Sequence, residues 1–125
     1  RDPAPSTSKH GKEHRMNKIS LDAVAREQLR LAHRAASGRS AETVYGGHER
    51  VLRQTLIALT ADTTMAEHES PGDATLLVVV GRVRLSSGSD EWEGRAGDLL
   101  VIPAARHTLD ALEDSAVLLT VAKTP

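Results

Sequence analysis

The most informative part of this sequence is Gly94-Arg95-Ala96-Gly97-Asp98-Leu99-Leu100-Val101-Ile102-Pro103, with His107 a few residues further on. Gly-Asp before an aliphatic run is typical of a turn that leads into a strand, and the proline should close that strand. A second stretch has related features: Met65-Ala66-Glu67-His68-Glu69-Ser70-Pro71-Gly72-Asp73-Ala74 precedes an apolar run at 75–80 that ends at Gly81. Each stretch therefore joins a histidine to a turn and a strand.

Short segments rich in β-forming residues surround these two stretches. Turn residues such as Ser87-Gly88-Ser89-Asp90 separate them, and no helical pattern lies between them, which disfavours βαβ units. A closed antiparallel sandwich or barrel over about Val51–Val121 is the economical architecture. The predicted strands are Val51–Leu59, Thr75–Val80, Arg82–Leu85, a short strand around Trp92, Leu99–Ile102, His107–Leu112 and Val117–Val121.

One helix is predicted before the strands. Ser20 is a good N-cap for a helix over Leu21–Ala36, and Gly38 supplies a stop signal. The stripe of Arg26, Arg30 and Arg34 is typical of a solvated helix face. Gly46-Gly47 then marks the change to strands. We therefore divide the chain into a leader at 1–15, a helix with its connector at 16–47, and a barrel at 48–125.

Composition narrows the class of protein. The 125 residues are 39% hydrophobic but include no Phe, one Trp and one Tyr, so the core must be aliphatic. No apolar run approaches the roughly 20 residues of a membrane span, and nothing resembles a nucleic-acid-binding motif. The absence of cysteine excludes disulfides and thiolate metal ligands. We expect a cytoplasmic protein that binds neither membranes nor nucleic acid.

Charge is unevenly distributed along the chain. Residues 1–18 contain five basic and two acidic residues, whereas the rest of the chain is mildly acidic and the net charge is −1. A basic leader is compatible with a nucleic-acid arm, but its low hydrophobicity with Pro, Ser and Lys favours a flexible or vector-derived segment. We expect residues 1–15 to lie outside the folded domain.

The two stretches resemble the two sequence motifs of the cupins. The resemblance implies an all-β fold, a double-stranded β-helix of jelly-roll form, with the N-terminal helix outside the shared pattern. Asp62 stands where the family has glycine, and His107 lies one residue closer to Pro103 than the family spacing. The positions that carry the resemblance are Asp62, His68, Gly81, Gly97, Pro103 and His107.

The metal ligands that the resemblance implies are incomplete. Cupins bind a metal through two histidines and a glutamate of the first motif and a histidine of the second. Here His68 and His107 occupy two of these positions, whereas Ser70 and Ala74 occupy the others. Serine is a poor ligand and alanine is none, and a firm site needs three or four ligands. No cofactor is firmly expected; a divalent transition metal held by His68 and His107 remains open.

The same two histidines are the candidate ligand-binding residues. The resemblance implies that His68 and His107 point into the barrel cavity, and Gln54, a polar residue in an apolar strand, is expected to face it too. Strand alternation should turn Glu67 and Glu69 away from His68.

Three functions remain open after the sequence. The first is a cupin that binds an unidentified small molecule; the second is a metal-dependent cupin enzyme of oxygenase, isomerase or decarboxylase type; the third is a regulatory or interaction protein. The incomplete ligand set favours the first over the second. We also expect a homodimer, because the extra amphipathic helix and the barrel have apolar surface to cover.

Overall fold

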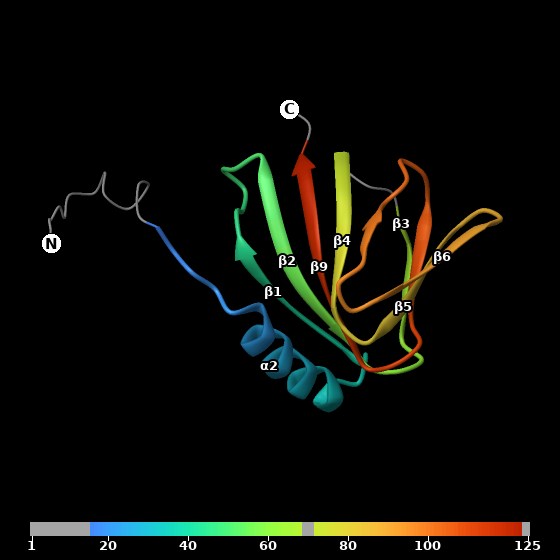
Figure 1. Ribbon diagram of the computed structural model, residues 1–125, viewed down its shortest axis with the longest axis horizontal. Helices are drawn as coiled ribbons and strands as arrows, with labels where there is room; N and C mark the ends of the chain where they lie inside the picture. The colour runs from blue at the N-terminus through green and yellow to red at the C-terminus, as the bar shows by residue number, and fades with distance from the viewer. Residues whose placement is uncertain (1–15, 69–71, 124–125) are drawn as a thin grey trace, which may run out of the picture.

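The fold consists of two antiparallel sheets that face each other, with one helix on the outside of the larger sheet (Figure 1). The structure, a computed structural model, describes residues 16–68 and 72–123. The elements are α2 (Leu21–Arg34), β1 (Arg39–Tyr45), β2 (Leu52–Leu59), β3 (Thr64–His68), β4 (Gly72–Val80), β5 (Arg82–Ser87), β6 (Asp90–Arg95), β7 (Leu99–Val101), β8 (His107–Ala111) and β9 (Ser115–Lys123).

The chain crosses repeatedly between the two sheets. The five-stranded sheet has the order β1-β2-β9-β4-β7 and the four-stranded sheet the order β3-β8-β5-β6. Strands that follow one another, such as β2 and β3 or β7 and β8, therefore lie in opposite sheets. This is the jelly-roll arrangement, and it confirms the all-β prediction with one N-terminal helix.

Residues 39–45 correct the predicted division of the chain. The sequence pattern puts them in the connector, ahead of a barrel that begins at residue 48. In the structure they form β1, which pairs with β2 from Arg39↔Leu59 to Tyr45↔Gln54. The sequence pattern did not indicate a strand because β1 is an edge strand and most of its side chains are exposed. An edge strand needs no alternation of apolar and polar residues.

The helix begins where the sequence predicted and ends slightly earlier. The Ala23 N–H donates to Ser20 Oγ at 3.2 Å, which is the expected N-cap. The helix ends at Arg34 instead of Ala36, because Ala35 is already extended and Gly38 adopts a φ of 72°. A Cβ at Gly38 would lie 2.5 Å from Thr63 Oγ1. The chain therefore turns at Gly38 in close contact with the loop between β2 and β3.

Two apolar clusters hold the layers together. The first fills the space between the sheets with aliphatic side chains such as Leu76, Val83 and Val117. The second joins α2 to the outer face of the five-stranded sheet through Ala25 and Leu56. The strands of that sheet are therefore apolar on both faces, which explains the continuous apolar run at 75–80. The 14-residue α2 is too short and too polar to cross a bilayer, and the described residues contain no other helix.

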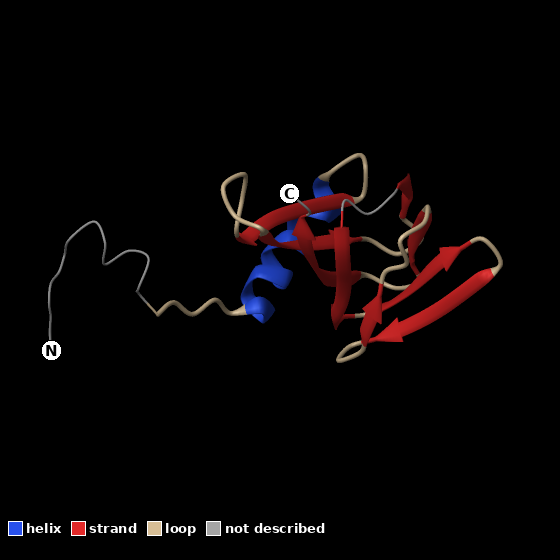
Figure 2. Ribbon diagram, turned by 90° about the horizontal axis from the view of Figure 1, so that it is seen from above, coloured by secondary structure: helices blue, strands red, loops and turns tan. Residues whose placement is uncertain are grey.

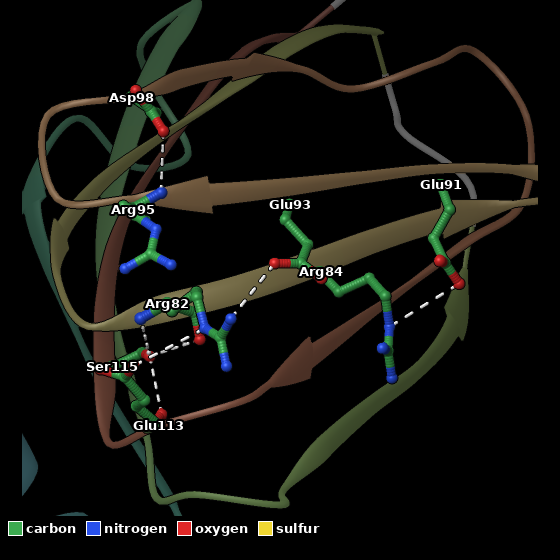
Figure 3. Close-up of polar contacts among 8 residues, drawn as sticks. All are labelled: Arg82, Arg84, Glu91, Glu93, Arg95, Asp98, Glu113 and Ser115. Atoms are coloured by element: carbon green, nitrogen blue, oxygen red, sulfur yellow. Dashed lines mark hydrogen bonds and ion pairs between the residues drawn. The ribbon is translucent and has the colours of Figure 1, made fainter.

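The outer face of the four-stranded sheet is charged instead. Arg82 and Arg84 on β5 alternate with buried Val83 and Leu85, so their guanidinium groups lie on the outside (Figure 3). Each arginine contacts two carboxylates on neighbouring segments. The ion pairs are Arg82–Glu93 at 3.5 Å, Arg82–Glu113 at 3.6 Å, Arg84–Glu91 at 3.7 Å and Arg84–Asp110 at 3.4 Å.

A hydrogen-bonded contact at the end of α2 ties the helix to the loops of the barrel. His33 Nε2 lies 2.7 Å from Asp114 Oδ2, and the Ala61 N–H donates to Asp114 Oδ1 at 2.8 Å. The hydrogen bond from Ala61, together with the contact to His33, lowers the pKa of the Asp114 carboxyl below its ordinary value. His33 is thus accounted for by a structural contact away from the barrel interior.

Candidate functional site

The Gly97-Asp98 pair of the second motif builds the turn between β6 and β7. Gly97 has a φ of 95°, and its N–H donates to the Val78 carbonyl at 2.8 Å. Asp98 Oδ2 accepts from the Arg95 N–H at 2.8 Å (Figure 3), while the Asp98 N–H donates to the Arg95 carbonyl. These motif residues therefore satisfy the backbone of a turn; they position the strand that leads toward His107.

Two further positions of the resemblance are also backbone requirements. Asp62 has a φ of 72° and is the one non-glycine residue with positive φ in the described part of the chain. This is the conformation for which glycine is best suited, which accounts for the family glycine at this place. At Gly81, with a φ of 88°, a Cβ would lie 2.3 Å from the Asp114 carbonyl oxygen. Neither position provides chemistry.

His107 faces the space between the sheets. Along β8, His107, Leu109 and Ala111 are buried while the residues between them are half-buried, so these three point inward. His107 is 3% exposed, and its Nδ1 lies 3.0 Å from the Ala105 carbonyl oxygen. In the neutral ring Nδ1 therefore carries the proton and donates, and Nε2 is the acceptor nitrogen.

His68 lies opposite His107 on the neighbouring strand. The two residues are Cα partners in the antiparallel pairing of β3 with β8, although they are far apart in the sequence. The fold thus brings together the two histidine positions that the resemblance singled out. The side chains of Glu67 and His68, and all of Glu69 and Ser70, lie outside the described residues, so the roles predicted for them stay predictions.

Ala74 occupies the place of the family glutamate and lies in the core. It is buried on β4, opposite Val121, and packs in the cluster between the sheets. Its methyl group offers no donor atom. Among the described side chains, no group of three or more His, Asp or Glu residues is placed to hold a metal ion. The described residues therefore do not fit a firm transition-metal site, which needs three or four protein ligands.

The prediction that Gln54 faces the cavity is wrong. The register between β2 and β9 is continuous, so Gln54 lies on the same face as Leu56, which packs toward α2. Gln54 Nε2 donates to Thr120 Oγ1 at 3.1 Å on this outer face. Alternation within the strand could not reveal this orientation, because both faces of β2 carry apolar residues.

Hollows lie at both open edges between the sheets. At the edge formed by β6 and β7, one cavity of about 310 Å³ and one of about 120 Å³ share the wall residues Leu85, Trp92 and Val101. At the opposite edge, a groove of about 280 Å³ is lined by Arg39, Thr55 and Met65 among others. The sequence did not single out any of these as site residues; its one tryptophan, in a chain otherwise poor in aromatic residues, was a signal that could have pointed to the first edge.

Comparison with known proteins supports the fold. No family model matches the sequence, and the curated proteins yield no significant match. Among solved structures, a conserved protein of unknown function from Streptococcus pyogenes is 25% identical, with a TM-score of 0.65 over 73% of this chain and 79% of that one. A cupin superfamily protein from Desulfitobacterium hafniense is 16% identical, with a TM-score of 0.63 over 69% and 78%.

A larger enzyme contains the same fold as one part. The salicylate 1,2-dioxygenase of Pseudoaminobacter salicylatoxidans, solved as adducts with gentisate, is 22% identical, with a TM-score of 0.67 over 81% of this chain. This chain spans 31% of the dioxygenase. The chain therefore has the fold of the cupin superfamily, as its two motifs implied.

Proposed function

We propose that this protein binds a small molecule inside the barrel, at His68 and His107, without a tightly held metal ion. One observation carries the proposal: His107 is almost completely buried in an aliphatic interior, and the other motif histidine lies directly opposite it on the next strand. An aliphatic side chain would fill an inward position of this kind at a lower desolvation cost than an imidazole, so packing alone does not explain the histidine.

The chemistry of the two rings suits binding and proton exchange. The hydrogen bond from His107 Nδ1 to the Ala105 carbonyl holds the ring in one tautomer. A ligand that bears a carboxylate or hydroxyl group can then bond to imidazole, which offers both a donor and an acceptor nitrogen when neutral. We place the site where β3 ends, at His68, and β8 begins, at His107.

A metal-dependent cupin enzyme is the second candidate. It draws support from the similarity of fold to the salicylate dioxygenase. Ala74 cannot supply a ligand there, so a third protein ligand would have to come from side chains that the structure does not describe, among which Glu67 and Glu69 both flank His68 in the sequence. Elemental analysis of the purified protein separates the candidates: we expect far less than one equivalent of iron, zinc, nickel or copper.

Binding is tested with salicylate and gentisate as the first probes. Ligand-observed NMR should show saturable binding to the wild-type protein, weakened at least about tenfold by His107→Ala, the factor for loss of one hydrogen bond to a charged group. His48→Ala, which changes an exposed loop histidine, is the matched control and should leave binding unchanged. Stoichiometric metal that disappears in His107→Ala would refute the metal-free site and establish the second candidate.

We propose in addition that two copies of the chain pair. The support is the part of the five-stranded sheet that α2 leaves uncovered: Leu52 and Tyr45 are exposed there beside the neutral pair Gln54 and Thr120. A two-fold axis through this area would place the same side chains opposite each other and cover them.

A further inference from the structure

The chain has one tryptophan, and it is not in the core. Trp92 is 68% exposed, although it lies on the face of β6 that is directed toward the other sheet. Its cross-strand partner Leu85 is 3% exposed. A large aromatic ring left in solvent beside a buried leucine marks a place where something can bind.

The strand β6 runs from a tightly packed end to an open end. At Gly94 the sheets are in close contact, since a Cβ there would lie 3.1 Å from Leu100 Cδ1 and 3.2 Å from Val78 Cγ2. The tip of the β5–β6 hairpin extends away from the larger sheet (Figure 2), and Trp92, two residues before Gly94, is exposed. The space that opens is the pair of adjoining cavities between β6 and the edge strand β7.

The walls of this space, which we call the Trp92 cleft, are apolar apart from one end. Asp90 and Ser87 form a cross-strand pair at the hairpin tip and line the smaller cavity. Among the described residues, no Lys, Arg or His lines either cavity of the cleft, and Asp90 is the one charged wall residue. The full lining is Leu85, Ser87, Asp90, Trp92, Leu99, Leu100, Val101 and Pro103.

Strand alternation separates Asp90 from the other acids of the hairpin. Asp90 and Trp92 lie on the inward face of β6, whereas Glu91 lies on the outward face, where it pairs with Arg84 at 3.7 Å. Asp90 has no ion pair among the described contacts. A carboxylate next to an indole ring attracts a cation through two interactions. The carboxylate forms a charge-assisted hydrogen bond, and the negative face of the ring forms a cation–π contact.

We propose that the Trp92 cleft binds a small organic ammonium ion, with the ammonium group at Asp90 and the apolar part against Trp92. The volumes of about 310 Å³ and 120 Å³ suit a molecule the size of one ring with a short amine side chain. His107 does not line this cleft, although Ser87, which does, donates to the carbonyl of Arg106 at 2.9 Å. The proposal goes beyond the function proposed above, and the variants of Asp90 and His107 distinguish the two sites.

Trp92 also provides the measurement, because it is the chain's one tryptophan and its fluorescence reports on this cleft alone. Benzylamine, which is charged at neutral pH, is titrated in parallel with the neutral benzyl alcohol and the anionic benzoate. We expect a saturable change with benzylamine at concentrations where the other two produce none. Asp90→Asn should weaken benzylamine at least about fivefold, the loss of one charge-assisted hydrogen bond. Glu91→Gln, its neighbour on the outer face, should match the wild type.

Each other outcome overturns the proposal. Equal responses to benzylamine and benzyl alcohol would make the cleft apolar without a charge preference, and no saturable response would mean that it is no site. A tryptophan spectrum that changes on dilution without ligand would show that a second copy occupies the cleft. Loss of the benzylamine response in His107→Ala but not in Asp90→Asn would move the amine to the barrel interior. Far-UV circular dichroism confirms that each variant is folded.

Discussion

The outer faces of the two sheets differ in how they meet their surroundings. On the four-stranded sheet, β5 presents Arg82 and Arg84 to carboxylates on β6, which Figure 3 shows, and on β8. On the five-stranded sheet, Leu56 is fully buried under α2, and Leu52 further along the same strand is exposed. The charged outer face of the four-stranded sheet can remain in contact with water. The apolar outer face of the five-stranded sheet has to be covered, and α2 covers only part of it.

The difference shows where stability resides. Exposed ion pairs contribute little, because water and salt screen the charges. Removing aliphatic side chains from water contributes much more for each residue buried. The helix is therefore a structural part of the barrel, although it lies outside the shared sequence pattern. The cross-strand ion pairs on the charged face favour one register of the strands, and the charges disfavour pairing with other chains on that side of the molecule.

The largest expected effect is in the helix-covered cluster. Leu56→Ala should lower the free energy of unfolding by about 2–5 kcal/mol, because it leaves a cavity between α2 and the sheet. Arg84→Ala on the charged face is the comparison and should cost about 1 kcal/mol or less. Urea unfolding followed by circular dichroism measures both. Equal losses would mean that the two faces contribute alike to stability.

Association depends on the uncovered part of the same face. If two copies pair there, light scattering at micromolar concentration should give twice the 13.4 kDa chain mass. Leu52→Lys should shift the protein toward the monomer, because a charge would be buried without a partner. Glu93→Lys on the charged face should leave the mass unchanged. A wild-type mass near that of one chain would refute the pairing.

Acid should weaken the attachment of the helix. The folded pKa of Asp114 is lowered, first by the hydrogen bond from the Ala61 N–H and also by His33. The stabilisation is therefore present above the unfolded pKa, ordinarily about 3.9, and is lost as pH falls through the lower folded value. The urea midpoint measured from pH 6 down to pH 3 should fall less steeply in Asp114→Asn. Parallel curves for wild type and variant would exclude this contribution.

The smallest effect concerns the loop that crosses from one sheet to the other. Asp62 has a φ of 72°, where a Cβ is disfavoured and Asp is better tolerated than most residues. Asp62→Ala should cost about 1 kcal/mol, whereas Asp62→Gly should unfold at the wild-type urea concentration or above it. If alanine and glycine behave alike, the backbone conformation does not explain the family glycine at this position.

Turns and short-range signals could be predicted from the sequence because their causes are local. The turn at Gly97-Asp98 and the N-cap at Ser20 depend on residues within a few positions of each other. The strand β1 could not be predicted from the sequence, because its polar side chains find their partners on another element. Buried Gln28 on α2 bonds to Ser40 and Glu42 of β1. These polar residues resemble a loop until the helix is placed beside them.

By itself the sequence determined the jelly-roll class, the helix with its N-cap, and the absence of a donor atom at Ala74, where the resemblance implies a glutamate. Those follow from residue types and near-neighbour spacing. Only the tertiary structure decided that Gln54 faces outward, that His107 lies buried opposite His68, and that Trp92 stands at the open edge. Such facts depend on which sheet covers which face. That is settled by the pairing of distant strands, where a shift of one residue reverses every side chain.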